Sequence, residues 1–270
     1  MSSRPRPGRA KKSLGQNFLV DANLQRRIVS ALGAGVDDEV LEIGPGRGAL
    51  TRHLVGEVGR LVLVELDDDL VEALEERWGG RDDVEVVHGD VLEVPLAEHL
   101  RNPEATRVVG NIPYNITTPI VFRLLERPRP RDIVLMVQDE VADRIVAPAG
   151  DGNYGALSVG VRTVARAEKL FRVRRGSFRP VPGVDSAVVR ITPLRPEPLT
   201  RLEEERLRRT VRAAFQWRRK QLRKILRDHP DLACSEATVD RVLARTGLRP
   251  ETRPERLEPE DFVRLAAALA

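Results

Sequence analysis

A carboxamide and a phenol lie three positions apart in the segment Gly110-Asn111-Ile112-Pro113-Tyr114. The exocyclic amine of a nucleobase or an amide is conjugated and a poor nucleophile, and acceptors that bond its hydrogens localise its lone pair. The side-chain oxygen of Asn111 and the backbone carbonyl of Ile112 can supply these acceptors, and Pro113 removes a competing N–H donor. The Tyr114 ring can stack on a planar substrate, which contributes about 1–3 kcal/mol per base. The segment indicates chemistry at an amino group on a flat ring, although such a turn can also be structural.

A glycine-rich segment, Glu42-Ile43-Gly44-Pro45-Gly46-Arg47-Gly48, stands between an expected strand and an expected helix. Glycines let the backbone approach a ligand closely, and the first N–H groups of a helix have no partner within it. Glu65 lies 21 residues after Gly44, where it can accept hydrogen bonds from both hydroxyls of a ribose. This pair suits an NAD-type cofactor, S-adenosylmethionine or a tight structural turn.

The residues after the third and fourth expected strands help to separate these cofactors. Asp90 in Gly89-Asp90-Val91 can accept a hydrogen bond from the amino group of an adenine. An NAD-dependent oxidoreductase would use the glycine segment and Glu65, but it gives no role to the segment that contains Asn111 and Tyr114. The sequence therefore favours S-adenosylmethionine as the cofactor.

The elements that must position these residues alternate between strands and helices. Strands are expected at 40–43, 61–64, 84–87, 107–110 and 133–137, with a later strand at 187–191 that runs antiparallel to its neighbour. Helices are expected from the N-cap Asp21 to Gly33 or Gly35, at 49–55 and at 70–77. This alternation predicts an α/β, Rossmann-like fold with a parallel doubly wound sheet, whose ligand sites lie at the carboxyl ends of the strands.

A proline-rich segment at 193–198 precedes a stretch with helical periodicity that continues to the end of the sequence. We therefore expect three parts. They are a flexible basic arm at 1–12, a catalytic domain that binds S-adenosylmethionine at 13–195, and a small all-helical RNA-binding domain at 196–270.

Basic residues are concentrated in separate segments. Residues 206–227 contain ten basic residues and no acid, 162–179 contain seven against one acid, and the first twelve contain five. Residues 57–104, in contrast, hold fifteen acids and four bases. With an isoelectric point of about 9.6, this distribution is typical of a protein that binds a polyanion, although any one cluster can be a solvated helix face. The phosphate-binding candidates in the 206–227 segment, expected to be one helix, are Arg218, Arg219, Lys220 and Arg223.

Composition excludes several classes of protein. The chain has 270 residues, of which 41% are hydrophobic, so it can bury a sizeable core. A single cysteine excludes a disulfide framework, and four scattered histidines give no metal-ligand spacing. No apolar run is long enough to span a bilayer, and the first residues lack the apolar stretch of a secretory signal. We expect a cytoplasmic monomer without a metal ion.

Taken in order, these motifs resemble the ribosomal RNA adenine N6,N6-dimethyltransferase family. The matching segments are 14–19, 42–51, 64–67, 89–90, 110–116, 154–159, 178–186, 212–223 and 253–262. The Asn-Ile-Pro-Tyr, Phe-x-Pro-x-Pro and Arg-Arg-Lys segments are the most specific. The last indicates the housekeeping branch, which modifies the small ribosomal subunit, rather than the antibiotic-resistance branch, which modifies the large one. The chain departs from the family pattern at Ile112, Thr117, Asp139 and Trp217.

The resemblance implies a role for each matched site residue. Cofactor contacts are implied for Asn17, Leu19, Gly44, Gly46, Glu65, Asp90 and Asn111. Asn111 and Tyr114 match the target-base site, and Phe178 matches a second wall around a flipped adenine. For Asn17 the alternative is a residue that caps a turn, and for Phe178 it is a core or loop anchor.

The resemblance also implies the reaction and its substrate. The expected activity is dimethylation of two adjacent adenines near the 3′ end of small-subunit rRNA, with S-adenosylmethionine as the methyl donor. The expected partner is the rRNA of an immature small ribosomal subunit. An alternative is an assembly checkpoint that recognises immature subunits, with methylation secondary.

Overall fold

The computed structural model describes Lys11 and residues 15–270, so the expected basic arm at 1–12 lies outside the described residues except for Lys11. The described chain forms two compact units. Unit 1 contains the residues up to Ala142 together with Glu168–Pro193, and unit 2 contains Asp143–Ala167 and Leu194–Ala270. The second junction lies within two residues of the expected boundary after residue 195. The expected catalytic domain at 13–195 includes Asp143–Ala167, but this segment is grouped with the C-terminal helices, although its last three residues begin strand β7 of the sheet.

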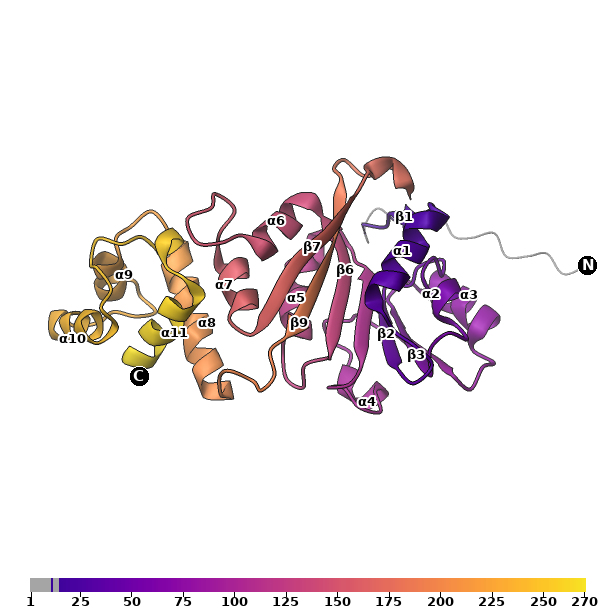
Figure 1. Cartoon of the computed structure of the whole chain (residues 1–270), viewed down its shortest axis with the longest axis horizontal. Coiled ribbons are helices and arrows are strands. Elements are labelled where there is room, and N and C mark those ends of the chain that lie inside the picture. Colours follow the sequence, from indigo (N-terminus) through magenta and orange to yellow (C-terminus); the bar gives the residue numbers. More distant parts are fainter. Residues whose placement is uncertain (1–10, 12–14) are drawn as a thin grey trace, which may run out of the picture. The chain divides into compact units, whose positions relative to one another are not determined.

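Unit 1 is built on a seven-stranded sheet in the order β4-β3-β2-β5-β6-β9-β7 (Figure 1). Its strands are β2 (Glu39–Ile43), β3 (Arg60–Glu65), β4 (Val84–His88), β5 (Arg107–Asn111), β6 (Asp132–Gln138), β7 (Ala165–Val173) and β9 (Ser186–Pro193). The strands from β2 to β6 run parallel, and β9 runs antiparallel to β6. A second, two-stranded sheet pairs β1 (Phe18–Leu19) with β8 (Phe178–Arg179). The expected Rossmann-like α/β fold and its late antiparallel strand are confirmed.

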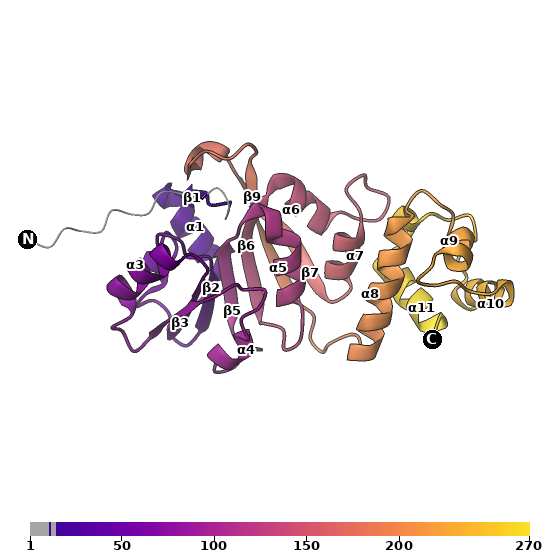
Figure 2. The ribbon, with the colours of Figure 1, turned by 180° about the vertical axis from the view of Figure 1, so that it is seen from behind.

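Helices cover both faces of the large sheet. The helices before β7 are α1 (Ala22–Leu32), α2 (Thr51–Leu54), α3 (Asp68–Trp78), α4 (Leu96–His99), α5 (Thr117–Leu124) and α6 (Asp139–Val146), of which α4 buries no side chain and α6 continues into unit 2. Figures 1 and 2 show α1 and α5 on opposite faces. Helix α1 begins and ends where the sequence predicts. At its start the Asp21 carboxylate accepts hydrogen bonds from two backbone N–H groups, and at its end Gly33 has a φ of 63°. Because both faces are covered, the central strands are almost continuously apolar.

The order of the strands reverses between β2 and β5. After β2 the chain moves outward to β3 and β4, and it then returns to form β5 and β6 on the other side. Ile43 pairs with Gly110 in the register of β2 and β5. The glycine segment that follows β2 therefore lies beside Asn111, at the edge where open parallel sheets bind their ligands.

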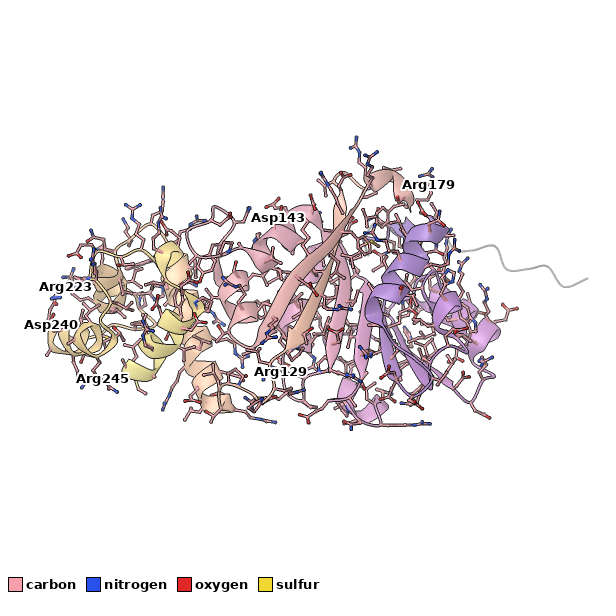
Figure 3. The ribbon with its side chains drawn as sticks, in the orientation of Figure 1. Arg129, Asp143, Arg179, Arg223, Asp240 and Arg245 are labelled. Atoms are coloured by element: carbon pink, nitrogen blue, oxygen red, sulfur yellow. The ribbon has the colours of Figure 1, made fainter. Side chains whose placement is uncertain are left out.

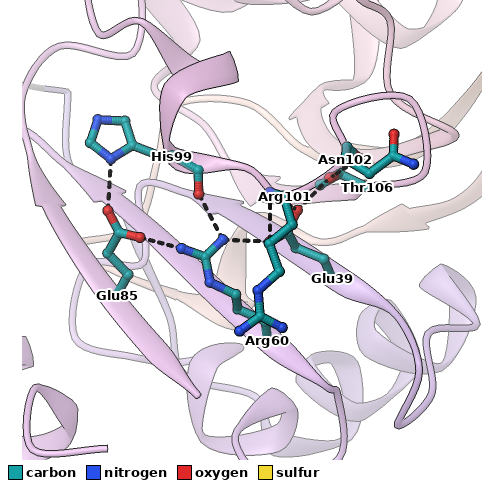
Figure 4. Close-up of polar contacts among 7 residues, drawn as sticks. All are labelled: Glu39, Arg60, Glu85, His99, Arg101, Asn102 and Thr106. Carbon is teal, nitrogen blue, oxygen red and sulfur yellow. Dashed lines mark hydrogen bonds and ion pairs between the residues drawn. The ribbon is translucent and has the colours of Figure 1, made fainter. Parts of the chain in front are cut away.

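The opposite, amino-terminal edge of the sheet is held by an ionic network (Figure 4). Arg60 on β3 donates to Glu39 on β2 at 2.5 Å, to Glu85 on β4, and to the backbone carbonyl of His99 at 2.7 Å. Glu39 also accepts a hydrogen bond from the Thr106 hydroxyl at 2.9 Å. Burial alone would raise the pKa of Glu39, but these donors lower it. The network fixes three neighbouring strands at the end that lies away from the glycine segment.

Unit 2 is helical. Its helices are α7 (Ala156–Arg162), α8 (Arg201–Gln216), α9 (Leu222–Asp228), α10 (Glu236–Thr246) and α11 (Pro259–Ala268). Its core contains an aromatic group in which Phe215 lies 6.0 Å from Tyr154 and 5.7 Å from Phe262 between ring centres. The Tyr154 hydroxyl also donates to the carbonyl of Leu257 at 2.7 Å. These contacts explain why Asp143–Ala167 belongs with the C-terminal helices.

The basic segment 206–227 was expected to form one helix, and this expectation is wrong. Helix α8 ends at Gln216 and α9 begins at Leu222, so Arg218, Arg219 and Lys220 lie in the connection between them. Within the described residues, no helix is long and apolar enough to cross a membrane. The same residues contain no group of three or more histidine, cysteine or acidic side chains arranged to hold a metal ion.

Candidate active site

A cavity of about 440 Å³ opens in unit 1 beside the glycine segment. Its volume falls in the range of roughly 300–1,000 Å³ that is common for small-molecule sites. Eight of the expected site residues line it: Asn17, Leu19, Gly44, Gly46, Glu65, Asp90, Asn111 and Tyr114. The structure therefore gathers residues from five separate segments of the sequence around one cavity.

The glycine segment turns sharply beneath this cavity. Gly46 has a φ of 59°, and its N–H donates to the Glu65 carboxylate at 2.9 Å. Gly48 has a φ of 72°, and a Cβ atom at this position would lie 2.2 Å from the Trp78 ring of α3. Side chains rarely adopt this backbone conformation, so glycine meets both the conformational and the steric requirement. The turn beneath the cavity therefore packs directly against helix α3 through Gly48 and Trp78.

Glu65 is held rigidly at the carboxyl end of β3. One carboxylate oxygen accepts from the N–H groups of Leu66 and Asp67 at 3.0 and 3.1 Å, and the other accepts from Gly46. Burial raises the pKa of Glu65, while the backbone donors favour its charged form. Asp90, after β4, accepts from the N–H of Leu92 at 2.9 Å. Two oriented acidic side chains therefore stand on the cavity wall, where their oxygens can accept hydrogen bonds from hydroxyl or amino groups of a ligand.

The amide of Asn111 is oriented by the chain itself. Its nitrogen donates to the backbone carbonyl of Asn17 at 2.9 Å. Since a carbonyl can only accept, the amide nitrogen must face Asn17, and no group in the described part of the chain bonds its oxygen Oδ1. The Asn17 side chain donates to the carbonyl of Gly15 at 3.1 Å, so it closes a local turn and also lines the cavity. The site thus offers an amide oxygen as a hydrogen-bond acceptor.

Tyr114 is fixed through its hydroxyl. The phenol oxygen lies 2.5 Å from Oγ of Ser186, which is fully buried at the start of β9. Burial raises the pKa of Tyr114, so the phenol stays protonated near neutral pH. The segment containing Ser186 carried part of the family resemblance, but sequence reasoning gave this residue no role. Its contact with Tyr114 holds the ring at the cavity wall.

Phe178 does not meet the expectation that it forms a second wall around a target base. Its side chain is fully buried in the core of unit 1, and it is not among the residues that line the cavity. The physical reason is the pairing of β1 with β8, which sets Phe178 opposite Leu19. Both side chains enter the same core, so Phe178 anchors the strand that carries Leu19 and fits the alternative of a core anchor.

Glu42 is a cavity residue to which sequence reasoning assigned no role. It is 1% exposed and accepts a hydrogen bond from the Thr51 hydroxyl at 2.8 Å. Burial raises the pKa of Glu42 to about 8. An acidic side chain among the apolar residues Val40, Leu41 and Ile43 of β2 was the signal that could have identified it.

The expected phosphate-binding residues lie in unit 2. Arg218, Arg219 and Lys220 are exposed and, with Trp217, line a shallow hollow of about 190 Å³. Arg223 on α9 differs, because both of its terminal nitrogens donate to Asp240, at 2.6 and 2.7 Å (Figure 3). The first three cations therefore offer more uncompensated charge to a polyanion than Arg223 does.

Known proteins resemble the chain over nearly its full length. Residues 8–270 match the family described as ribosomal RNA adenine dimethylase. The chain is 43% identical to ribosomal RNA small subunit methyltransferase A of Pseudomonas aeruginosa over 263 residues, which cover 97% of the chain and 95% of that relative. It is 40% identical to the protein of the same name from Geobacillus thermodenitrificans, over 96% of the chain and 90% of the relative.

Solved structures agree with these matches. A dimethyladenosine transferase from Plasmodium falciparum superposes with a TM-score of 0.78 at 28% identity, covering 92% of this chain and 95% of that one. The 23S rRNA methyltransferase ErmE superposes with a TM-score of 0.68 at 31% identity, covering 94% of this chain and 99% of that one.

The sheet order and the cavity at its carboxyl edge define an S-adenosylmethionine-dependent methyltransferase of Rossmann-like fold. The chain belongs to the ribosomal RNA adenine dimethylase family. The sequence-based assignments of fold, family and cofactor are confirmed.

Proposed function

We propose that the chain dimethylates the N6 amines of two adjacent adenines near the 3′ end of small-subunit rRNA, and that it does so during maturation of the small subunit. The observation that carries this proposal is the oriented amide of Asn111 beside the fixed ring of Tyr114 in one cavity. Family membership and the small-subunit relatives support the same reaction.

The residues around the cavity fit S-adenosylmethionine. In this proposal the methionine part lies over the Gly44–Gly46 turn, Glu65 accepts hydrogen bonds from the ribose hydroxyls, and Asp90 accepts one from the adenine amine, since all of these residues line the cavity. When bound, the cofactor supplies a methyl group already activated on a sulfonium. The protein therefore contributes orientation more than proton transfer.

Asn111 acts on the target amine. Its oxygen Oδ1 accepts one amine hydrogen, and the backbone carbonyl of Ile112 is proposed to accept the other. As the amine nitrogen gains positive charge during transfer, these acceptors bind it more strongly, which lowers the barrier. The proton released afterwards passes to solvent.

Tyr114 receives the base. The adenine must leave its stack, which costs a few kcal/mol, and stacking on the Tyr114 ring recovers part of this energy. Because Ser186 holds the phenol, the ring does not need to be ordered at each binding event.

In unit 2, Arg218, Arg219 and Lys220 are proposed to bind phosphates of the same rRNA, with a smaller contribution from Arg223, whose charge Asp240 partly compensates. The proposed partner is the rRNA of an immature small subunit. The protein is proposed to act as a monomer in the cytoplasm.

The test is mass spectrometry of small-subunit rRNA fragments after incubation with the protein and labelled S-adenosylmethionine. We expect two adjacent dimethyladenosines near the 3′ end. Asn111→Ala should lower the methylation rate by at least 100-fold, while S-adenosylhomocysteine still raises the melting temperature. Label at another position, or wild-type turnover by Asn111→Ala, would contradict the proposal.

A further inference from the structure

The segment 174–184 in unit 1, here called the arginine loop, carries several positive charges and no negative one. It connects β7 to β9 and contains Arg174, Arg175 and Arg179. No acidic residue occurs from residue 169 to residue 184. All three arginines are exposed.

The nearby carboxylates are engaged by other cations. Asp139 accepts from Lys169 at 2.7 Å and from Arg172 at 3.2 Å. Asp185 lies 3.2 Å from the other end of the Arg172 guanidinium. Asp185 also accepts from the backbone N–H of Arg175 at 2.9 Å, which fixes the base of the loop. The acids therefore compensate residues that precede the loop and leave its own guanidinium groups positive.

Two of these guanidinium groups are held in place by neutral partners. Arg179 donates to the carbonyls of Gly176 and Phe178 at 3.1 and 2.7 Å, and Arg175 approaches the carbonyl of Gly183 at 3.4 Å. Carbonyl groups orient a guanidinium without cancelling its charge, and its five N–H donors are not all used. The loop thus presents ordered cations with donors available to an anion.

The arginine loop adjoins the cavity. β8 of this loop pairs with β1, and the carbonyl of Ser177 accepts from the N–H of Val20 at 2.9 Å. Phe18, Leu19 and Val20 all line the cavity. Figure 3 labels Arg179, which lies beside the strand labelled β1 in Figure 1. The end of the loop also leads within two residues to Ser186, which holds Tyr114.

Two valines complete the surface. Val181 and Val184 are 52% and 48% exposed, among the few large apolar side chains of the described chain that face solvent to this extent. Ordered guanidinium groups beside apolar side chains match a nucleotide strand, whose phosphates are anionic and whose sugars and bases offer apolar faces.

We propose that the arginine loop binds the RNA strand next to the target adenine, with its arginines on phosphates and its valines against sugars or bases. This inference rests on the proposed function and adds a second RNA-binding surface, on unit 1. The loop thereby holds the strand that leads to Tyr114.

The test compares two double variants of the full chain. Arg174→Gln/Arg175→Gln removes two charges from the loop, and Arg101→Gln/Arg131→Gln removes two from exposed arginines near the amino-terminal ends of β5 and β6. The probe is a hairpin RNA with two adjacent adenines in its loop, titrated at several salt concentrations. We expect the loop variant to bind roughly tenfold more weakly at low salt. Its slope of log affinity against log salt should fall by about 1.4, the value for two phosphate contacts on a single strand. The control should match wild type.

Further measurements separate the possible failures. Both variants should bind S-adenosylhomocysteine as wild type does, which shows that the cavity is intact. Arg174→Lys/Arg175→Lys should recover most of the salt slope, since the charges are kept. If wild type methylates the RNA but the loop variant keeps the slope of the control, the arginine loop is not an RNA contact. If wild type neither binds nor methylates the RNA, the proposed function itself fails.

Discussion

Several polar residues around the cavity are held by partners that lie far away in the sequence. Ser186 is the clearest case, since it bonds the Tyr114 phenol across 72 positions. Ser186→Ala removes this partner, and we expect kcat/KM for rRNA to fall about five- to tenfold, as for one lost hydrogen bond of about 1 kcal/mol. Tyr114→Phe should show a similar loss, and the double variant should lose little more, because the two changes remove the same bond. Steady-state kinetics measure this. Fully additive losses would show that Ser186 does not act through Tyr114.

Glu42 gives stability a pH dependence. With a pKa of about 8 in the folded chain and an ordinary value of 4.5, the folded state keeps a proton that the unfolded state releases between these values. The stabilisation that Glu42 gains from keeping its proton is complete below about pH 4.5. As the pH rises towards 8, the free energy of unfolding falls by about 1.4 kcal/mol per pH unit. Denaturant unfolding at pH 5.5 and 7.5 should show a larger loss of stability for wild type than for Glu42→Gln. If wild type and Glu42→Gln lose the same free energy of unfolding between these pH values, the pH dependence does not come from Glu42.

Residue types revealed much of this site before the structure did. Glu65, Asp90 and Asn111 stand at the ends of strands, where a polar side chain has few structural explanations. Ser186 and Phe178 could not be assigned in this way, because their roles depend on strand pairs that form across long sequence separations. A buried aromatic anchor and a base-stacking aromatic have the same sequence signature.

At the scale of elements, the glycine turn joins the cavity floor to α3. In Gly48→Ala the new Cβ would lie 2.2 Å from Trp78, at a φ that alanine rarely adopts. Gly56→Ala is a matched control, because Gly56 has a φ of 82° and no atom within 4 Å of a Cβ there. We expect Gly48→Ala to lower the free energy of unfolding by about 1–3 kcal/mol more than the control does. Similar losses in both variants, measured by denaturant unfolding, would mean that Trp78 moves aside easily.

Apolar runs located the central strands to within one or two residues, since these strands are buried on both faces. The edge strand β7, with the sequence ARAEKLFRV, is only partly buried, has no such run and was not predicted. The two-residue strands β1 and β8 carry too little pattern to be recognised. The break between α8 and α9 was also missed, because its residues continue a basic, helix-compatible composition.

At the scale of the whole molecule, RNA affinity is expected to depend on where charge lies rather than on net charge. Changing Arg218, Arg219 and Lys220 to alanine should lower the salt slope of rRNA binding by up to about 2.7, the value for three duplex phosphate contacts. The same substitution at Arg241, Arg245 and Arg249, which are also exposed in unit 2, should change it little. Filter binding across salt concentrations measures both. Equal slopes for the two triple variants would refute a specific role for the first group.

The assignment of Asp143–Ala167 to unit 2 restricts how this protein can be divided or recombined. A fragment that stops at Pro193 would keep this segment but lose Leu257 and Phe262, so the Tyr154 hydroxyl would lose its acceptor and the segment its apolar neighbours. Such a truncation should aggregate rather than give a soluble catalytic half. Chimeras that exchange the helical part between relatives would need to transplant both stretches together.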